Sequence, residues 1–390
     1  MVDLNKLFLC MIRSEVFGKE PEPDIKKHLN DDTISELFTL SVKHDLSCII
    51  ISALDRMGVL DDSEDAKKKR KKIMVSALRD GQKEHAMKTV SDIFEENEIP
   101  YLPLKGAVIR HLYPQTWMRT SCDIDVLIHE SDAQKAIDKL CQNGFERKED
   151  QTKHDYSLET PGGVNFELHY VLTTQGRLPE ADEILSSVWD YAQTTESGFK
   201  YSMTTEMFLL YHVVHMAKHF FNGGCGVRPF IDLKLLQQKM NFNIDVLNEL
   251  MDRANIRRFY ECVSNLCDVW FDEETHNALT EQIESFVFTG GVYGTRSNSA
   301  KIKAARGDSS FKVFFKLVFL SPSDLSIVYP ELKKHPKLFL FYQVKRWFRI
   351  FNRNKRMKVK SLTHARNSVV QSDIDATSSL LKSMGLKNEM

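Results

Sequence analysis

The spacing of apolar residues divides the chain into three parts. Up to about residue 95, apolar positions recur three and four apart, for example at Leu4, Leu7 and Met11, which predicts helices. The same period returns after residue 204 and is clearest over 208–220 and 231–236. Both ends of the chain are therefore predicted to be helical.

The middle part, from 99 to 171, contains shorter runs of the kind that form strands. In several of them apolar and polar residues alternate, which is typical of half-buried strands. The sequence Pro161-Gly162-Gly163 separates two such runs and predicts a hairpin. Strands are expected at 101–104, 122–129, 156–159 and 164–171, and helices at 107–112 and 133–141.

These patterns predict an α+β protein in which a small mixed sheet, covered by helices, lies between two helical regions. We expect an N-terminal helical region over 1–95, a core over 96–200, a C-terminal helical domain over 201–371 and a polar tail over 372–390. Such a tail is expected to fray.

Composition and charge narrow the class of protein. The chain has 390 residues, 42% of them hydrophobic, which is enough to bury a sizeable core. Its 53 Lys and Arg nearly cancel its 54 Asp and Glu, which argues against a general nucleic-acid coat. No apolar run approaches the ~18 residues that span a bilayer, and we expect no secretion signal. Seven single cysteines without a Cys-x-x-Cys exclude a disulfide framework and favour the cytoplasm.

The most informative segment places two acids inside an apolar strand. Side chains alternate along a strand, so Asp123 and Asp125 emerge on one face while Ile124 and Val126 point to the other. Two carboxylates at this spacing can converge on a divalent cation, which offsets their repulsion. The alternative is a solvated strand edge or an ion-pair site with Arg119.

A second strand presents further candidates. Alternation over 164–170 buries Phe166 and Leu168 and presents Glu167 and His169 together. If this strand lies beside the first, Glu167 completes a three-carboxylate cluster suited to two-metal phosphoryl or nucleotidyl transfer. An exposed sheet face is the alternative for Glu167.

The sequence Lys105-Gly106 is expected at a strand-to-helix turn just before these strands. Gly106 allows the backbone to approach a phosphate, free N–H groups of the following helix point at it, and Lys105 adds a positive charge.

Together these motifs resemble the family of uncharacterised nucleotidyltransferases, within the DNA polymerase beta-like nucleotidyltransferase superfamily. The resemblance rests on Leu104-Lys105-Gly106, Tyr113-Pro114, Arg119 with Asp123-Ile124-Asp125, and Phe166-Glu167-Leu168-His169. It implies a polymerase beta-like core in which Asp123, Asp125 and Glu167 bind Mg²⁺ or Mn²⁺ and are catalytic, and Lys105, Gly106 and Arg119 bind the nucleotide. Lys-Gly stands where the superfamily has Gly-Gly or Gly-Ser.

The activity implied is transfer of a nucleoside monophosphate from a nucleoside triphosphate such as ATP to a hydroxyl acceptor, with release of pyrophosphate. The acceptor is a small molecule, a protein or an RNA. A toxin-like transferase that modifies protein or RNA, and a nucleotide-binding scaffold without turnover, are the rival hypotheses.

Several polar residues keep two interpretations. Arg119 holds a phosphate or pairs with the acids. His154 and His169 orient a ligand or are satisfied packing histidines. His212 and His215 share a helix face with His219, a spacing that could suit a metal. The favoured interpretation is that they line a cleft between helices and sheet or are packed. Arg228 and Asp232 border an acceptor pocket or pair with each other.

Two basic stretches are candidates for anionic partners. The run at 67–72 follows acids at a predicted helix start and is interpreted as a solvated helix end. The stretch 345–360, where aromatic and basic residues mix, suits RNA or a membrane surface, as does the apolar stretch 311–319 for a membrane. A solvated helix end is the favoured interpretation of 345–360.

Overall fold

The computed structural model describes most of the chain. The described residues are 3–21, 24–121, 123–151, 155–173, 176–195, 198–291, 298–299, 301–302, 322, 325, 329, 331–350 and 371–386. His154, the stretch 311–319 and residues 351–360 lie outside them, so the interpretations given for those segments stay predictions.

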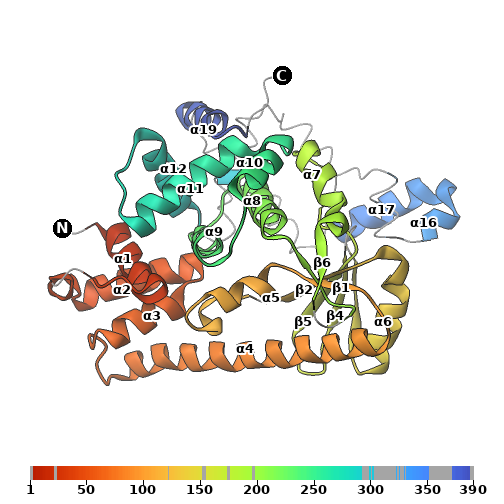
Figure 1. The fold of residues 1–390 in the computed structure, drawn as a ribbon, viewed down its shortest axis with the longest axis horizontal. Coiled ribbons are helices and arrows are strands. Elements are labelled where there is room, and N and C mark those ends of the chain that lie inside the picture. The colour runs from red at the N-terminus through yellow and green to blue at the C-terminus, as the bar shows by residue number, and fades with distance from the viewer. Residues whose placement is uncertain are drawn as a thin grey trace.

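The N-terminal region is helical, as predicted. It comprises α1 (Leu4–Phe17), α2 (Asp31–His44), α3 (Ser47–Arg56) and α4 (Glu64–Glu96). Ser63 begins α4 by accepting the backbone N–H of Ala66, and Glu64 and Asp65 occupy its positive end. With 33 residues, α4 is about 50 Å long. Figure 1 shows it along one side of the molecule, from the N-terminal helices to the sheet.

The central sheet has five strands in the order β1-β2-β5-β4-β3. Strands β2 and β5 are parallel, whereas the other neighbours are antiparallel. The predicted hairpin around Pro161-Gly162-Gly163 is confirmed as the β4–β5 pair. The strands are β1 (Tyr101–Pro103), β2 (Asp123–Ile128), β3 (Glu146–Gln151), β4 (Asp155–Glu159) and β5 (Asn165–His169).

The two faces of the sheet have different surroundings. Ile124, Val126, Phe166 and Leu168 are buried in one core with residues of α4 and of α6 (Ala133–Gln142). Leu127, on the other face, belongs to a larger core with the C-terminal helices. The predicted alternation is thus confirmed, and Asp123 and Asp125 share the face of Leu127, toward the C-terminal helices.

The chain enters α5 (Lys105–Ile109) directly from β1, so Lys105 and Gly106 are the first helical residues. The predicted turn there is wrong, because Leu104 remains extended as the N-cap and the helix begins at the next residue. Two short 3-10 helices, η2 (Arg110–Leu112) and η3 (Thr116–Met118), follow α5. Others occur elsewhere in the chain: η1 (Ile25–His28), η4 (Glu130–Asp132), η5 (Val188–Tyr191) and η6 (Pro336–Leu338).

Where the structure describes the C-terminal half, it is helical apart from loops and a small two-stranded sheet of β6 (Ala192–Thr194) and β7 (Tyr201–Met203). Most of its helices share one hydrophobic core with α1, α2 and α3, whereas α16 and α17 contribute Leu332 and Tyr342 to a separate small cluster. They are α7 (Pro179–Ser186), α8 (Thr205–Asn222), α9 (Arg228–Lys239), α10 (Ile244–Arg253), α11 (Arg257–Asp272), α12 (Ala278–Gly290), α16 (Glu331–Lys334), α17 (Phe339–Ile350) and α19 (Gln371–Ser383).

Residues 372–386, the described part of the predicted polar tail, are ordered into a helix and its cap rather than frayed. Helix α19 is continuous, and Leu380, Leu381, Met384 and Leu386 are buried in the shared core. Leu380 and Leu381 lie in the last turn of α19 and Met384 and Leu386 just after it, so the apolar residues gather at one end of the segment and dock there despite its polar composition. No helix among the described residues combines the length and the apolar character that a membrane crossing requires.

Candidate active site

The pairing of β2 with β5 brings the predicted acids together. In this parallel pair Asp123 lies beside Asn165 and Asp125 lies beside Glu167. Asp125 is nearly buried, with 16% of its side chain exposed, whereas Glu167 has 35% exposed. One acid is thus fixed within the fold, and its neighbour remains accessible.

His169 contacts both acids from the end of β5. Its Nε2 is 3.1 Å from Oδ1 of Asp125 and 3.5 Å from Oε2 of Glu167. Asp125, Glu167 and His169 each offer an atom that lies within 4.8 Å of the other two, close enough to ligate one cation. Carboxylate oxygens suit Mg²⁺ and Mn²⁺. Burial lowers the pKa of His169, but its hydrogen bonds to Asp125 and Glu167 outweigh burial and raise the pKa to about 9, so its Nε2 donates to the two acids.

The electrostatics of this cluster differ from one acid to the next. Burial, followed by the charges of Asp125 and Glu167, raises the pKa of Asp123. Burial also opposes ionisation of Asp125, but the hydrogen bond from His169 and the charge of Lys105 outweigh it and lower its pKa. Asp125 is therefore an ionised acceptor, and Asp123 is held in a field that a cation would relieve.

Lys105 lies beside these carboxylates at the start of α5. The backbone N–H of Leu104 donates to the carbonyl of Asp125 at 3.0 Å, which ties the start of this helix to β2. Desolvation lowers the pKa of Lys105, and the charges of Asp125 and Asp123 oppose that effect. The Lys105 ammonium thus interacts with the acid pair from the side of the C-terminal helices.

Two histidines of α8 continue the hydrogen bonding from Lys105. Its Nζ is 3.0 Å from Nδ1 of His215, and Nε2 of His215 is 2.9 Å from Nε2 of His219. Lys105 has only N–H donors, so Nδ1 of His215 accepts and its Nε2 carries the hydrogen toward His219. His212, one turn earlier, contacts the carbonyl of Pro229 instead.

Arg119 is paired with Asp232, a residue of α9. Its Nε and Nη2 donate to the two carboxylate oxygens, both at 2.9 Å, and the hydroxyl of Tyr113 donates to the same carboxylate at 2.7 Å. Gly106 makes room for this pair, because a Cβ at that position would lie 3.1 Å from Nη1 of Arg119. Of the two interpretations of Arg119, the structure shows ion pairing, with Asp232 rather than with the acids of β2.

Six of the predicted polar residues meet in a cavity of about 70 Å³, which we call the cationic cavity. Arg228 reaches it from the first residue of α9, and its Nη1 donates to Asp45 and to the carbonyl of Thr120. It is therefore not paired with Asp232. The cavity is lined by His44, Lys105, Arg119, His212, His215, His219, Gly226, Arg228, Pro229 and Asp232.

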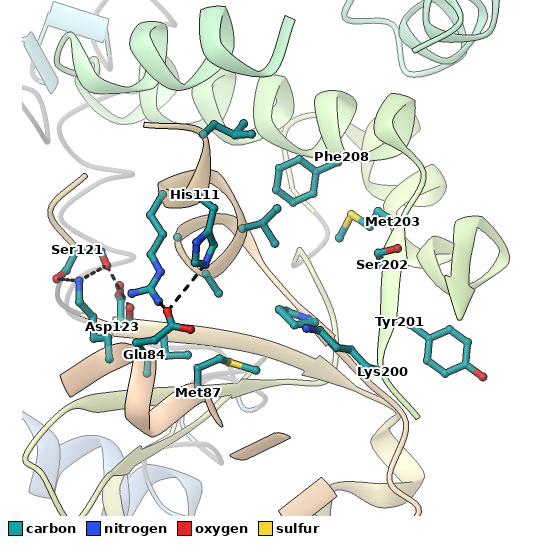
Figure 2. A pocket seen from close by; sticks show the side chains of 18 of the residues that line it. Glu84, Met87, His111, Ser121, Asp123, Lys200, Tyr201, Ser202, Met203 and Phe208 are labelled. Carbon is teal, nitrogen blue, oxygen red and sulfur yellow. Dashed lines mark hydrogen bonds and ion pairs between the residues drawn. The ribbon is translucent and has the colours of Figure 1, made fainter. Parts of the chain in front are cut away.

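A larger cavity of about 410 Å³ is lined in part by Gly106. Figure 2 shows Asp123 and Ser121 at one end of it and Met203 and Phe208 at the other. Its walls are mainly apolar, and Lys83 of α4 donates to the carbonyl and hydroxyl oxygens of Ser121, both at 3.2 Å. We call it the Asp123 cavity.

Comparison with known proteins gives one result. The model of a protein family described as "Uncharacterised nucleotidyltransferase" matches residues 30–272, which is more than half of the chain. The chain belongs to this family. No curated protein and no solved structure matches it. Membership of the uncharacterised nucleotidyltransferase family points to transfer of nucleotidyl groups, whereas the polymerase beta-like assignment of the core stays a prediction.

The region that matches the nucleotidyltransferase family includes both groups of predicted residues. Asp123, Asp125, Glu167 and His169 lie at the β2–β5 pair. The cationic cavity brings together Lys105, Arg119, His212, His215, Arg228 and Asp232. The roles of these residues as ligands or catalysts stay predictions.

Sequence reasoning missed residues that other elements contribute. His44 reaches the cationic cavity from the end of α2, and Lys83 reaches the Asp123 cavity from α4. Tyr211 of α8 is buried close enough to Asp125 for that charge to help raise the pKa of its hydroxyl, after burial itself. A single histidine, lysine or tyrosine in a helical pattern carries no signal of such a contact.

Proposed function

We propose that this protein is a metal-dependent nucleotidyltransferase. It transfers a nucleoside monophosphate from a nucleoside triphosphate to a hydroxyl acceptor and releases pyrophosphate. The observation that carries the proposal is the alignment of Asp125 with Glu167 on parallel strands, with Asp123 on the same face two residues earlier. Family membership supports the same class of reaction.

The donor set fits a divalent cation. Asp125 and Glu167 supply carboxylate oxygens, His169 holds both by contacts from its Nε2 within the same 4.8 Å group, and Asp123 faces the same charges. These residues would hold Mg²⁺ or Mn²⁺. When bound, the cation would neutralise charge on the triphosphate and on the attacking oxygen.

The residues of the chain divide the remaining work. Lys105 adds a positive charge beside the carboxylates, where the triphosphate must lie if it is to approach them. The acceptor oxygen bonds to the α-phosphorus, the bond from that phosphorus to the bridging oxygen breaks, and pyrophosphate leaves. Glu167, the more exposed acid of the aligned pair, takes the proton of the acceptor hydroxyl.

The Asp123 cavity supplies space for the larger part of a substrate. Its volume of about 410 Å³ lies within the usual range of small-molecule sites, ~300–1,000 Å³. Apolar side chains such as Met87, Met203 and Phe208 line it, and Asp123 stands at one end. A nucleoside or an acceptor of similar size in this cavity would reach Asp123 at the start of β2.

An unbiased acceptor screen tests the proposal. The purified protein is incubated with Mg²⁺, with each α-³²P-labelled nucleoside triphosphate and with cell extract separated into protein, RNA and small molecules. We expect label in one fraction, together with pyrophosphate release, and neither with Asp125→Asn. Binding of a triphosphate with no transfer in any fraction would instead support the nucleotide-binding scaffold.

A further inference from the structure

The cationic cavity collects more positive than negative charge. Three of its lining side chains, Lys105, Arg119 and Arg228, are cationic, and one, Asp232, is anionic. Both oxygens of Asp232 are bonded to Arg119, so this carboxylate neutralises only one of the three cations. The carboxylate that pairs with Arg228 belongs to Asp45, outside the lining, with 49% of its side chain exposed.

Donor groups in the cavity remain available for a ligand. Within the described part of the chain, only Nη1 of Arg228 makes hydrogen bonds, which leaves its Nη2 and Nε free. Nδ1 of His44 accepts the N–H of Val227 at 3.4 Å, so its Nε2 carries a hydrogen. That Nε2 is buried and has no partner among the described residues, although buried donors are nearly always paired.

The positive charge around the cavity also affects the pKa values of two histidines of α8. Burial and then the charge of Lys105 lower the pKa of His215 well below its usual value, and the same causes lower the pKa of His219 to about 4. These rings stay neutral beside Lys105 and can orient N–H groups without adding charge. An anion between them and the cations would relieve the field.

We propose that the cationic cavity binds one compact tetrahedral anion, the phosphate group of a substrate, between Lys105, Arg228 and the imidazoles of His44 and His219. The volume of about 70 Å³ is far below the ~300–1,000 Å³ that is usual for a small-molecule site. It accepts a single phosphate group rather than a base or a sugar. Arg and Lys are the usual partners of phosphate oxygens.

The phosphate has two chemical sources, and this part of the proposal rests on the proposed transferase function. Lys105 belongs both to the cavity and to the surroundings of Asp125, so a phosphate held there lies next to the carboxylate cluster. It is the terminal phosphate of the triphosphate, or it belongs to a phosphorylated acceptor.

Calorimetric titration with inorganic phosphate tests the cavity without catalysis. We expect the wild-type protein, in low salt without divalent cations, to bind one phosphate, and Arg228→Gln to bind it about tenfold or more weakly, since a hydrogen bond to a charged group contributes ~1.5–3 kcal/mol. Arg257→Gln is the matched control, because Arg257 is also paired with a carboxylate but lies outside the cavity. His219→Phe supplies a second variant if Arg228→Gln does not fold, and it should weaken binding as well.

The outcomes separate this proposal from the transferase proposal. Asp125→Asn should bind phosphate as tightly as the wild-type protein or more tightly, even though it loses transfer. Failure of the wild-type protein to bind phosphate, or equal binding by the cavity variants, would overturn the anion site and leave the carboxylate cluster untouched. Saturation with ATP then distinguishes the two sources. If ATP but not AMP displaces inorganic phosphate, the cavity holds the terminal phosphate of the triphosphate. If inorganic phosphate still binds in the presence of ATP, the cavity holds the phosphate of a phosphorylated acceptor.

Discussion

Asp125 and Glu167 are register partners on the parallel strands β2 and β5, and Nε2 of His169 contacts the carboxylates of both. The parallel register explains why acids from separate parts of the chain lie side by side on one face of the sheet. A hydrogen-bonded ladder fixes their spacing, so the pair does not depend on a loop conformation. Rigid strands are suited to hold ligands that must converge on one ion.

Asparagine at 125 or glutamine at 167 should abolish transfer and preserve the fold. Asp125→Asn and Glu167→Gln keep side-chain shape but remove a negative charge that a cation needs. Loss of groups around metal ligands typically lowers activity 10–100-fold, so loss of a ligand itself should lower it by about 100-fold or more. Initial rates of pyrophosphate release measure the effect, and circular dichroism verifies the fold.

Glu159→Gln is the matched control for these two variants. Glu159 lies on β4 in the same sheet, opposite Asn165, and pairs with Lys148. It should retain nearly the full rate. If both Asp125→Asn and Glu167→Gln react at the wild-type rate, neither carboxylate is needed for the reaction.

Removal of the cation should stop the reaction, and Mn²⁺ should report on the site directly. The free-Mn²⁺ signal in electron paramagnetic resonance is expected to fall when wild-type protein is added. Asp125→Asn should weaken this binding about tenfold or more, because outer-shell changes already cost 10–100-fold. Full activity after exhaustive chelation would contradict a divalent cation in the reaction.

The acid pair could be predicted from the sequence because side chains alternate between the two faces of a strand, so the order of residues shows which of them share a face. The alternation of Asp123, Ile124, Asp125 and Val126 corresponds to what the structure buries and what it leaves partly exposed. The hairpin that carries Glu167 was marked by its turn residues. Local patterns of this kind are decided by neighbours in the chain.

The remaining contacts are long-range and left no local signal. Arg119 and Asp232 are separated by 113 positions, and His44 reaches the same cavity from the N-terminal helices. Strand β3 was not predicted, because Glu146–Gln151 consists only of charged and polar residues and has no apolar face. Its pairing with β4, rather than any alternation of its own, makes this segment a strand.

The buried Arg119–Asp232 pair should be important for stability. Their side chains are 9% and 3% exposed, so Asp232→Asn leaves a buried guanidinium without its counter-charge. Breaking a buried pair from one side costs about 3–5 kcal/mol. Urea unfolding of the variant should show a loss of this size, and Asp92→Asn, at an exposed pair with Lys88, should show little change. Equal midpoints would mean that Asp232 does not balance Arg119.

A methyl group at position 106 should disturb the same pair. The Cβ of Gly106→Ala would lie 3.1 Å from Nη1 of Arg119, and the two bonds to Asp232 keep the guanidinium from moving away freely. Overpacking of this kind costs about 1–3 kcal/mol. Gly81→Ala is a control with the opposite sign, since no atom lies within 4 Å of its new Cβ and alanine favours a helix by ~0.5–1 kcal/mol. If both substitutions stabilise the protein, the guanidinium of Arg119 must move away from the new methyl group at little cost.

Stability should fall in mild acid because His44 is held neutral. Burial and the charge of Lys43 lower its pKa from 6.5 to about 4. Between these values the unfolded chain binds a proton that the folded protein does not, so stability rises with pH there and is lost as pH falls from 6.5 toward 4. One such group contributes up to about 1.4 kcal/mol per pH unit. His44→Asn keeps an acceptor for the N–H of Val227 but loses the ring that packs against Phe8 and Phe288, so its free energy of unfolding should be lower at pH 7. Because asparagine does not titrate, that free energy should also depend less on pH. Urea unfolding at half-unit intervals from pH 7 to 4 measures both curves, and parallel curves would show that His44 is not the group that titrates.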